Sequence, residues 1–203
     1  KDDELLGDPE WCPLEARVAS VARCLHPSVV YCPNVTGPTA TLIDRARRVV
    51  DLGATGVMVN AFAQGLDAVL ALRDAGLGVP ILAHRVGSGP WVRNDRFGVA
   101  APVLARLTRM AGADFVLVGA YGGKLFDSDA DVDAQIAAVR GPDGGARAAT
   151  AVLGGGIRPS DARAQLARAG GSGLLALLGS AAYAWEGGDV GAAVHATVEA
   201  VRG

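Results

Sequence analysis

The sequence has very little lysine. Of its 19 basic residues, only Lys1 and Lys124 are lysines, and all the others are arginines. Arginine replaces lysine wherever a positive charge is enough, but it does not supply an amine that loses its proton and reacts. Two lysines kept against this bias indicate positions where the amine itself matters. The alternative is that both lie on the surface by chance.

Long apolar runs are also missing, since none reaches the ~18 residues that a membrane-spanning helix needs. A net charge of −2 and a pI of about 5.9 indicate no basic surface for nucleic acid or an anionic membrane. No basic and apolar leader opens the sequence, and the three cysteines lack metal-like spacing. We therefore expect a cytoplasmic protein with reduced thiols, no nucleic-acid partner and no membrane partner.

The sequence does contain a regular alternation of short apolar runs and longer segments of helical period. The runs are apolar throughout, as in parallel strands that are buried on both faces. Strands are expected at Val29–Cys32, Val57–Val59, Pro80–Ala83, Phe115–Val118, Ala149–Leu153 and Leu174–Leu178, with Lys1–Glu4 as the end of a further strand. Helices are expected at Pro13–Cys24, Thr41–Leu52, Leu66–Asp74, Val99–Met110, Ala130–Arg140, Asp161–Ala169 after an N-cap at Ser160, and Val190–Arg202.

The spacing of these strands decides between two folds. Strand starts lie roughly 25–35 residues apart, which is the length of a βα unit. A doubly wound sheet and an eight-stranded barrel both fit, but no break marks a reversal of strand order, which favours the barrel. We predict a single α/β domain over residues 1–203. It is a (β/α)8 TIM barrel from the end of its second strand to its last helix, without the first strand.

Acidic residues beside Lys1 indicate a metal site. In such barrels the chemistry lies at the carboxyl ends of the strands. Asp3 and Glu4 carry the oxygen ligands that Mg²⁺ prefers, and Lys1 shares a strand face with Asp3. The alternative for a KDDE tetrapeptide is a plain ion pair.

Four further polar residues follow the next strands. Asn34 and Asn60 are candidate substrate ligands, and His84 is a candidate acid or base. Arg85 is a candidate clamp for a carboxylate or a second anion.

Glycines follow the last two predicted strands, at Gly155 and Gly156 and at Gly179, which Ser180 follows. Exposed main-chain N–H groups before a helix bind phosphate, although Gly154–Gly156 also fits a tight turn. Lys124 lies in a glycine-flanked loop that can close over a substrate. The alternatives are an exposed loop lysine and an aldolase whose Lys124 forms a Schiff base.

Together these residues resemble the catalytic barrel of the RuBisCO superfamily. The matching motifs are KDDE (Lys1–Glu4), YCPNVT (Tyr31–Thr36), HR (His84–Arg85), GGKL (Gly122–Leu125) and GGGI (Gly154–Ile157). The resemblance implies that CO2 converts Lys1 to a carbamate, which binds Mg²⁺ with Asp3 and Glu4. It matches Lys124 to the mobile-loop lysine. It also implies an α+β domain before the barrel and a homodimer or higher homo-oligomer.

Departures from the family pattern indicate a type IV, RuBisCO-like protein and not a ribulose-bisphosphate carboxylase. They fall at Leu117, Gly154, Asn60–Ala61 and Leu178–Ser180. We expect a Mg²⁺-dependent lyase or isomerase that forms the enolate of a phosphorylated keto-sugar or keto-sugar acid. Lys124 and Arg85 favour decarboxylation or cleavage of a 3-oxo sugar-acid phosphate.

Two alternatives remain. NAFAQGLD (Asn60–Asp67) is similar to the RuBisCO-like enolases, which indicates an enolase or isomerase of methylthio-sugar phosphates in methionine salvage. The other alternative is a non-catalytic protein that binds a sugar phosphate.

Overall fold

The computed structural model describes residues 1–94, 96–141, 147–185 and 188–202. Its centre is a parallel sheet in which each strand pairs with the next along the chain, in the order β1-β2-β3-β4-β5. The strands are β1 (Val57–Asn60), β2 (Ile81–His84), β3 (Phe115–Val118), β4 (Thr150–Leu153) and β5 (Leu174–Ala176). Every residue of β1 and β2 is buried, as their continuous apolar character predicts.

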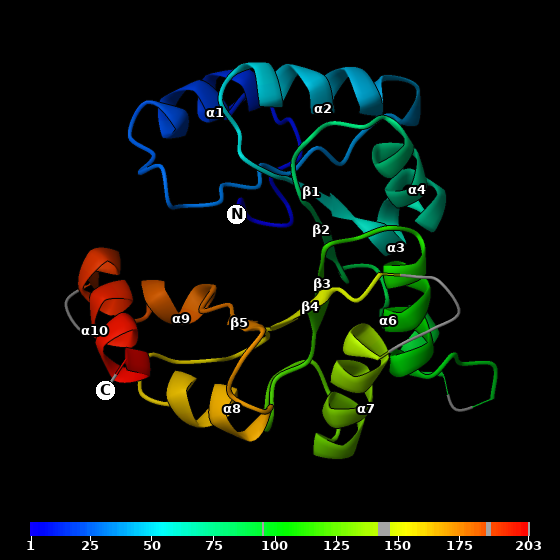
Figure 1. Ribbon diagram of the computed structural model, residues 1–203, viewed down its shortest axis with the longest axis vertical. Coiled ribbons are helices and arrows are strands. Elements are labelled where there is room, and N and C mark those ends of the chain that lie inside the picture. The colour runs from blue at the N-terminus through cyan, green and yellow to red at the C-terminus, as the bar shows by residue number, and fades with distance from the viewer. Residues whose placement is uncertain (95, 142–146, 186–187, 203) are drawn as a thin grey trace.

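Helices form an arc outside these strands (Figure 1). In chain order they are α1 (Leu14–Ala22), the 3-10 turn η1 (Thr39–Thr41), α2 (Leu42–Asp51), α3 (Ala61–Gln64), α4 (Leu66–Asp74), α5 (Gly89–Val92), α6 (Ala101–Met110), α7 (Asp129–Arg140), α8 (Ala162–Arg168), α9 (Ser180–Tyr183) and α10 (Val190–Arg202). Within the residues described, β5 does not pair with β1, so the sheet stays open. The arrangement is the parallel βα part of a TIM barrel, as the sequence predicts.

The core lies between the helices and the outer face of the sheet. Helix α2 buries Leu42, Ala46 and Val49, which recur at helical spacing, and leaves Arg47 and Arg48 exposed. Helix α7 does the same with Val132, Ile136 and Val139, after a capping box in which Ser128 and Asp131 exchange hydrogen bonds. Each fully buried aliphatic side chain contributes about 1.5–3 kcal/mol. This packing fixes the strand ends, where the polar residues lie.

Some sequence predictions were wrong in detail. The Val29–Cys32 segment is not a strand, because it pairs with no neighbouring strand in the part of the chain that the structure describes. Val29 and Val30 are 47% and 48% exposed, and among the described residues the bridge to β1 is made by Asn34 with Met58. The Lys1–Glu4 segment joins this stretch through the hydrogen bond from Asp2 N to Cys32 O, at 3.2 Å, and forms no strand.

The other differences concern helices. The N-cap of α8 is Asp161 and not Ser160. The short helices α3, α5 and α9 were not predicted, whereas α4 and α10 have the predicted bounds. Over the four described stretches of chain, no helix has both the length and the apolar character to cross a membrane.

Candidate active site

Asp2 anchors the segment that carries the predicted metal ligands. This carboxylate is buried and accepts hydrogen bonds from Arg17 Nε (2.8 Å), the Tyr31 hydroxyl (2.7 Å) and the main-chain N–H of Asn34 (3.0 Å). A buried charge of this kind is tolerated because it is paired and fully hydrogen-bonded. Burial and the neighbouring Asp2 raise the pKa of Tyr31 well above its usual value, so Tyr31 stays a donor. Asp2 therefore holds the segment in place without using the carboxylates of Asp3 and Glu4.

The side-chain amides of two asparagines also hold this segment. The Nδ2 of Asn34 donates to the main-chain oxygens of Asp3 (3.3 Å) and Glu4 (3.1 Å), and the Nδ2 of Asn60 donates to that of Glu4 (2.7 Å). Asn34, a predicted substrate ligand, is completely buried and supports the segment through these bonds. Asn60 Oδ1 is also buried but has no hydrogen-bond partner. A donor group reaching Asn60 Oδ1 would therefore be favourable.

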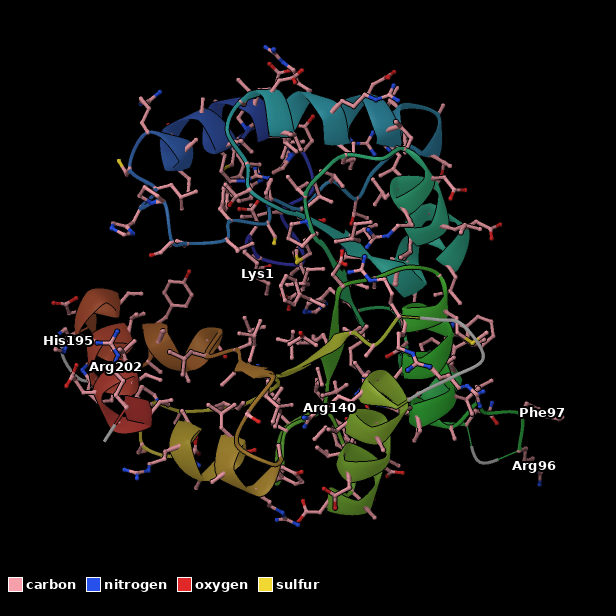
Figure 2. The ribbon with its side chains drawn as sticks, viewed as in Figure 1. Lys1, Arg96, Phe97, Arg140, His195 and Arg202 are labelled. Atoms are coloured by element: carbon pink, nitrogen blue, oxygen red, sulfur yellow. The ribbon has the colours of Figure 1, made fainter. Side chains whose placement is uncertain are left out.

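Lys1, Glu4 and His84 come together at the ends of β1 and β2. Lys1 Nζ lies 3.4 Å from Glu4 Oε2, and His84 Nε2 lies 3.7 Å from the same oxygen. His84 ends β2 directly beside Asn60, the last residue of β1. We call Lys1, Asp3, Glu4, Asn60 and His84 the acidic cluster. Figure 2 places Lys1 inside the outline of the molecule, below α1 and α2.

Electrostatics set the protonation state of this cluster. Burial, and then the charge of Lys1, lower the pKa of His84 to about 4, so its ring is neutral at pH 7. Val86 N–H donates to His84 Nδ1 at 3.1 Å, which places the ring proton on Nε2, toward Glu4. Burial alone would raise the pKa of Glu4, but a main-chain hydrogen bond, His84 and Lys1 outweigh it and lower this pKa. Glu4 is therefore an anion that faces a neutral donor.

The donor set of the acidic cluster suits Mg²⁺ under one condition. Asp3 is exposed and Glu4 is partly exposed, so both carboxylates are accessible. Across the described residues, however, no three His, Cys, Asp or Glu side chains gather into a metal-binding group. A third oxygen ligand would have to come from Lys1 itself, as its carbamate, and Lys1 Nζ lies next to Glu4. The cluster thus fits a magnesium ion if Lys1 is carbamylated.

Lys124 meets the glycines that follow β4 and β5. Its main-chain N–H donates to Gly155 O at 2.7 Å, and its Nζ donates to Ser180 Oγ at 3.2 Å. Gly155 and Gly156 both have positive φ, at 98° and 122°. We call Lys124, Gly155, Gly156, Gly179 and Ser180 the lysine–glycine cluster. The predicted phosphate residues are therefore together, joined by the predicted loop lysine.

The helices after these glycines differ from the expectation. Helix α8 begins six residues after Gly156 and has seven residues, and α9 has four. Helix dipoles are weak at this length. Positive charge in the lysine–glycine cluster therefore comes mainly from Lys124.

Arg85, the predicted anion clamp, is held by an acidic partner in this structure. Its guanidinium donates to both carboxylate oxygens of Asp127, at 2.7 and 3.2 Å, and to Gln135 Oε1 at 2.9 Å. The side chains of Arg85 and Asp127 are only 10% and 6% exposed. Sequence reasoning missed Asp2, Asp127 and Gln135. Asp2 lies inside the KDDE motif, but nothing in the sequence marks Asp127 or Gln135.

Comparisons with known proteins identify the family of this chain. The family model for the catalytic domain of the ribulose bisphosphate carboxylase large chain matches residues 1–198. A ribulose bisphosphate carboxylase-like protein of Allochromatium vinosum is 33% identical over 162 residues, which are 76% of this chain and 35% of that protein. The 2,3-diketo-5-methylthiopentyl-1-phosphate enolase of Geobacillus kaustophilus is 42% identical over 126 residues, 58% of this chain and 30% of the enzyme.

A solved structure shows the same fold. The octameric RuBisCO of Pyrococcus horikoshii is 25% identical and superposes with a TM-score of 0.83 over 98% of this chain and 50% of that one. The chain thus spans half or less of the length of these relatives. A family match over nearly the whole chain, together with the parallel βα fold, means that this chain belongs to the RuBisCO large-chain family, as a catalytic barrel domain of its RuBisCO-like proteins.

Proposed function

We propose that the protein carrying this chain is a Mg²⁺-dependent enzyme that forms the enolate of a phosphorylated keto-sugar or a related ketone phosphate. The observation that carries the proposal is the acidic cluster, in which Lys1 Nζ and His84 Nε2 both lie within 4 Å of Glu4 Oε2. The lysine–glycine cluster supports it, because it lies at the same carboxyl edge of the sheet and offers a cation for a phosphate group.

The residues of this chain have separable roles in the proposed reaction. Enolate formation transfers a proton from the carbon next to a ketone to a general base of the full-length protein and leaves negative charge on the ketone oxygen. His84, neutral with its proton on Nε2, is suited to donate a hydrogen bond to that oxygen. Lys124 and Ser180, with the N–H groups of Gly155, Gly156 and Gly179, would hold the phosphate and so orient the ketone. Magnesium held by the Lys1 carbamate, Asp3 and Glu4 would supply positive charge beside the ketone oxygen.

Among substrates, a methylthio-ketone phosphate is the first candidate. The Geobacillus kaustophilus enzyme is named as an enolase of such a compound. The sequence prediction of a sugar-acid substrate relied on both Lys124 and Arg85. Arg85 is paired with Asp127, so only Lys124 still favours decarboxylation or cleavage of a 3-oxo sugar-acid phosphate.

Magnesium binding to the full-length protein tests the metal part of the proposal. We expect bicarbonate to tighten Mg²⁺ binding by at least tenfold in the wild type, roughly the contribution of one charged ligand. Lys1→Arg is the matched variant, because arginine keeps the charge and forms no carbamate. Equal Mg²⁺ affinity with and without bicarbonate in the wild type would reject the carbamate site.

The chemistry is tested by isotope exchange. A ketone phosphate labelled with deuterium next to the carbonyl should lose the label to water only with the full-length enzyme, Mg²⁺ and bicarbonate. Phosphate binding without exchange would favour the non-catalytic sugar-phosphate-binding protein. Covalent trapping of substrate on Lys124 by borohydride would instead favour the aldolase alternative.

A homodimer or larger homo-oligomer is part of the proposal. The Pyrococcus horikoshii RuBisCO, which has the same fold in its barrel, is described as octameric. Light scattering on the full-length protein measures the assembly directly.

A further inference from the structure

The segment that carries Lys124 is tied down along most of its length. It runs from Gly119, after β3, to Ser128, the N-cap of α7. Gln165 holds Tyr121 at both main-chain groups, accepting from its N–H at 3.0 Å and donating to its oxygen at 2.8 Å. Gly122 N–H donates to Asp129 at 3.2 Å, and Lys124 N–H donates to Gly155 O.

Arg85 and Asp127 make the strongest of these ties. Two parallel N–H to oxygen bonds join the guanidinium to the carboxylate, the geometry in which such a pair is strongest. Gln135 on α7 accepts a third bond from Arg85 and is itself only 1% exposed. A void beside Arg85 has a volume of about 10 Å³, room for one water at most. The void is therefore too small for a substrate anion.

Two glycines make room for this arrangement. A Cβ on Gly119 would lie 2.5 Å from Asp127 Oδ2, although the φ of Gly119 is not positive, so space and not conformation requires glycine there. A Cβ on Gly155 would overlap the side chain of Leu125. Phe126, which lies between Leu125 and Asp127 in the chain, has a φ of 67°, a strained value for a bulky residue. Such a conformation persists only where the contacts on both sides fix it.

We infer that Arg85 and Asp127 form a clasp that fixes the Lys124 segment. Arg85 directly follows His84 in the acidic cluster, and Asp127 lies three residues after Lys124. The clasp therefore links the two clusters and sets the position of Lys124. Arg85 is a positioning residue that acts through Lys124 and not an anion ligand. The part that concerns phosphate rests on the proposed function.

Hydrogen exchange in the ligand-free, full-length protein tests the clasp without reference to function. Asp127→Asn keeps the size of the side chain and removes its charge, and we expect exchange of residues 119–127 to become about tenfold faster or more. Gly119→Ala should act in the same way, because it displaces the Asp127 carboxylate. Asp114→Asn is the control, since Asp114 also pairs with an arginine, Arg73, but precedes β3 at the opposite end of the sheet. Unchanged exchange of residues 119–127 in both clasp variants overturns the inference.

Binding of inorganic phosphate tests whether the clasp acts through Lys124. Asp127→Asn should weaken phosphate binding about tenfold in the wild type and have little further effect in a Lys124→Met background. An equal loss in both backgrounds would mean that Asp127 does not act through Lys124 and would also overturn the inference. A wild type that binds no phosphate contradicts the proposed function instead, and the exchange result then decides the clasp alone.

Discussion

The side-chain amide of Asn34 donates to the main-chain oxygen of Glu4, 30 residues earlier, at 3.1 Å. Because Asn34 also bonds Asp3 O, Asn34→Ala leaves buried carbonyls with fewer donors and releases the segment that carries both carboxylates. We expect a loss of about 1–3 kcal/mol in the free energy of unfolding. We also expect Mg²⁺ affinity to fall about tenfold, as for a metal site that loses a supporting hydrogen bond. Denaturant unfolding and calorimetric Mg²⁺ titration measure the two effects.

Asn94→Ala is the control for this prediction. Asn94, like Asn34, bonds the main chain through its side chain, accepting from the N–H groups of Arg96 and Phe97. These bonds are exposed to solvent. The variant should leave Mg²⁺ binding unchanged. If both variants bind Mg²⁺ as the wild type does, Asn34 has no part in holding the acidic cluster.

Gly155→Ala should disturb the lysine–glycine cluster in two ways, through backbone strain and through displacement of Leu125. Its φ of 98° already costs a side chain about 1–3 kcal/mol, and the new Cβ would also push Leu125 away. Gly65→Ala is the matched control, because Gly65 has a φ of 100° and open space around its Cβ position. Both variants should lose stability, but only Gly155→Ala should lose phosphate binding, measured by calorimetry. Equal phosphate affinities in the two variants would contradict the packing of Leu125 on Gly155.

The three cysteines should differ sharply in reactivity. Burial raises the pKa of Cys32 to about 11, whereas Cys24 is exposed and Cys12 is partly exposed. At pH 8 only about one Cys32 in a thousand is then a thiolate, which is the reactive form. A disulfide reagent should label Cys24 quickly in the native protein and Cys32 only after unfolding. Cys24→Ser should remove the fast phase. Fast labelling of Cys32 in the native protein would contradict its burial.

Local patterns in the sequence predicted much of the fold. Helices α4 and α10 have the predicted bounds, because apolar periodicity and glycine boundaries are local properties. The predicted strand at Val29–Cys32 was wrong because that prediction also used local properties alone. Its β-branched residues favour a strand, but whether a stretch pairs depends on its neighbours, and pairing with β1 falls on Asn34 instead. The four-residue helices are too short to show a period.

The candidate site was predictable in its members but not in all of its contacts. Residues at strand ends must share one edge of a parallel sheet, so topology alone groups His84 with Asn60. The partner of Arg85 could not be predicted in this way. Asp127 is 42 residues away in a loop, and no periodicity or motif marks a carboxylate that lies against Gly119. Such a pair depends on the three-dimensional path of the loop.

Histidine 84 should make the stability of the metal-free protein depend on pH. Its pKa is about 4 in the folded state, against an ordinary value of 6.5, so below pH 6.5 the unfolded chain binds a proton that the folded chain does not. The free energy of unfolding should therefore fall as the pH is lowered from 6.5. The loss is about 2 kcal/mol by pH 5. His84→Gln should remove this pH-dependent component. The free energy of unfolding should then change with pH in the same way in the variant and the wild type above pH 7, and should fall more steeply in the wild type below it. Urea unfolding in EDTA between pH 5 and pH 8 measures both profiles. Parallel profiles over the whole range would mean that His84 is not held neutral by its burial beside Lys1.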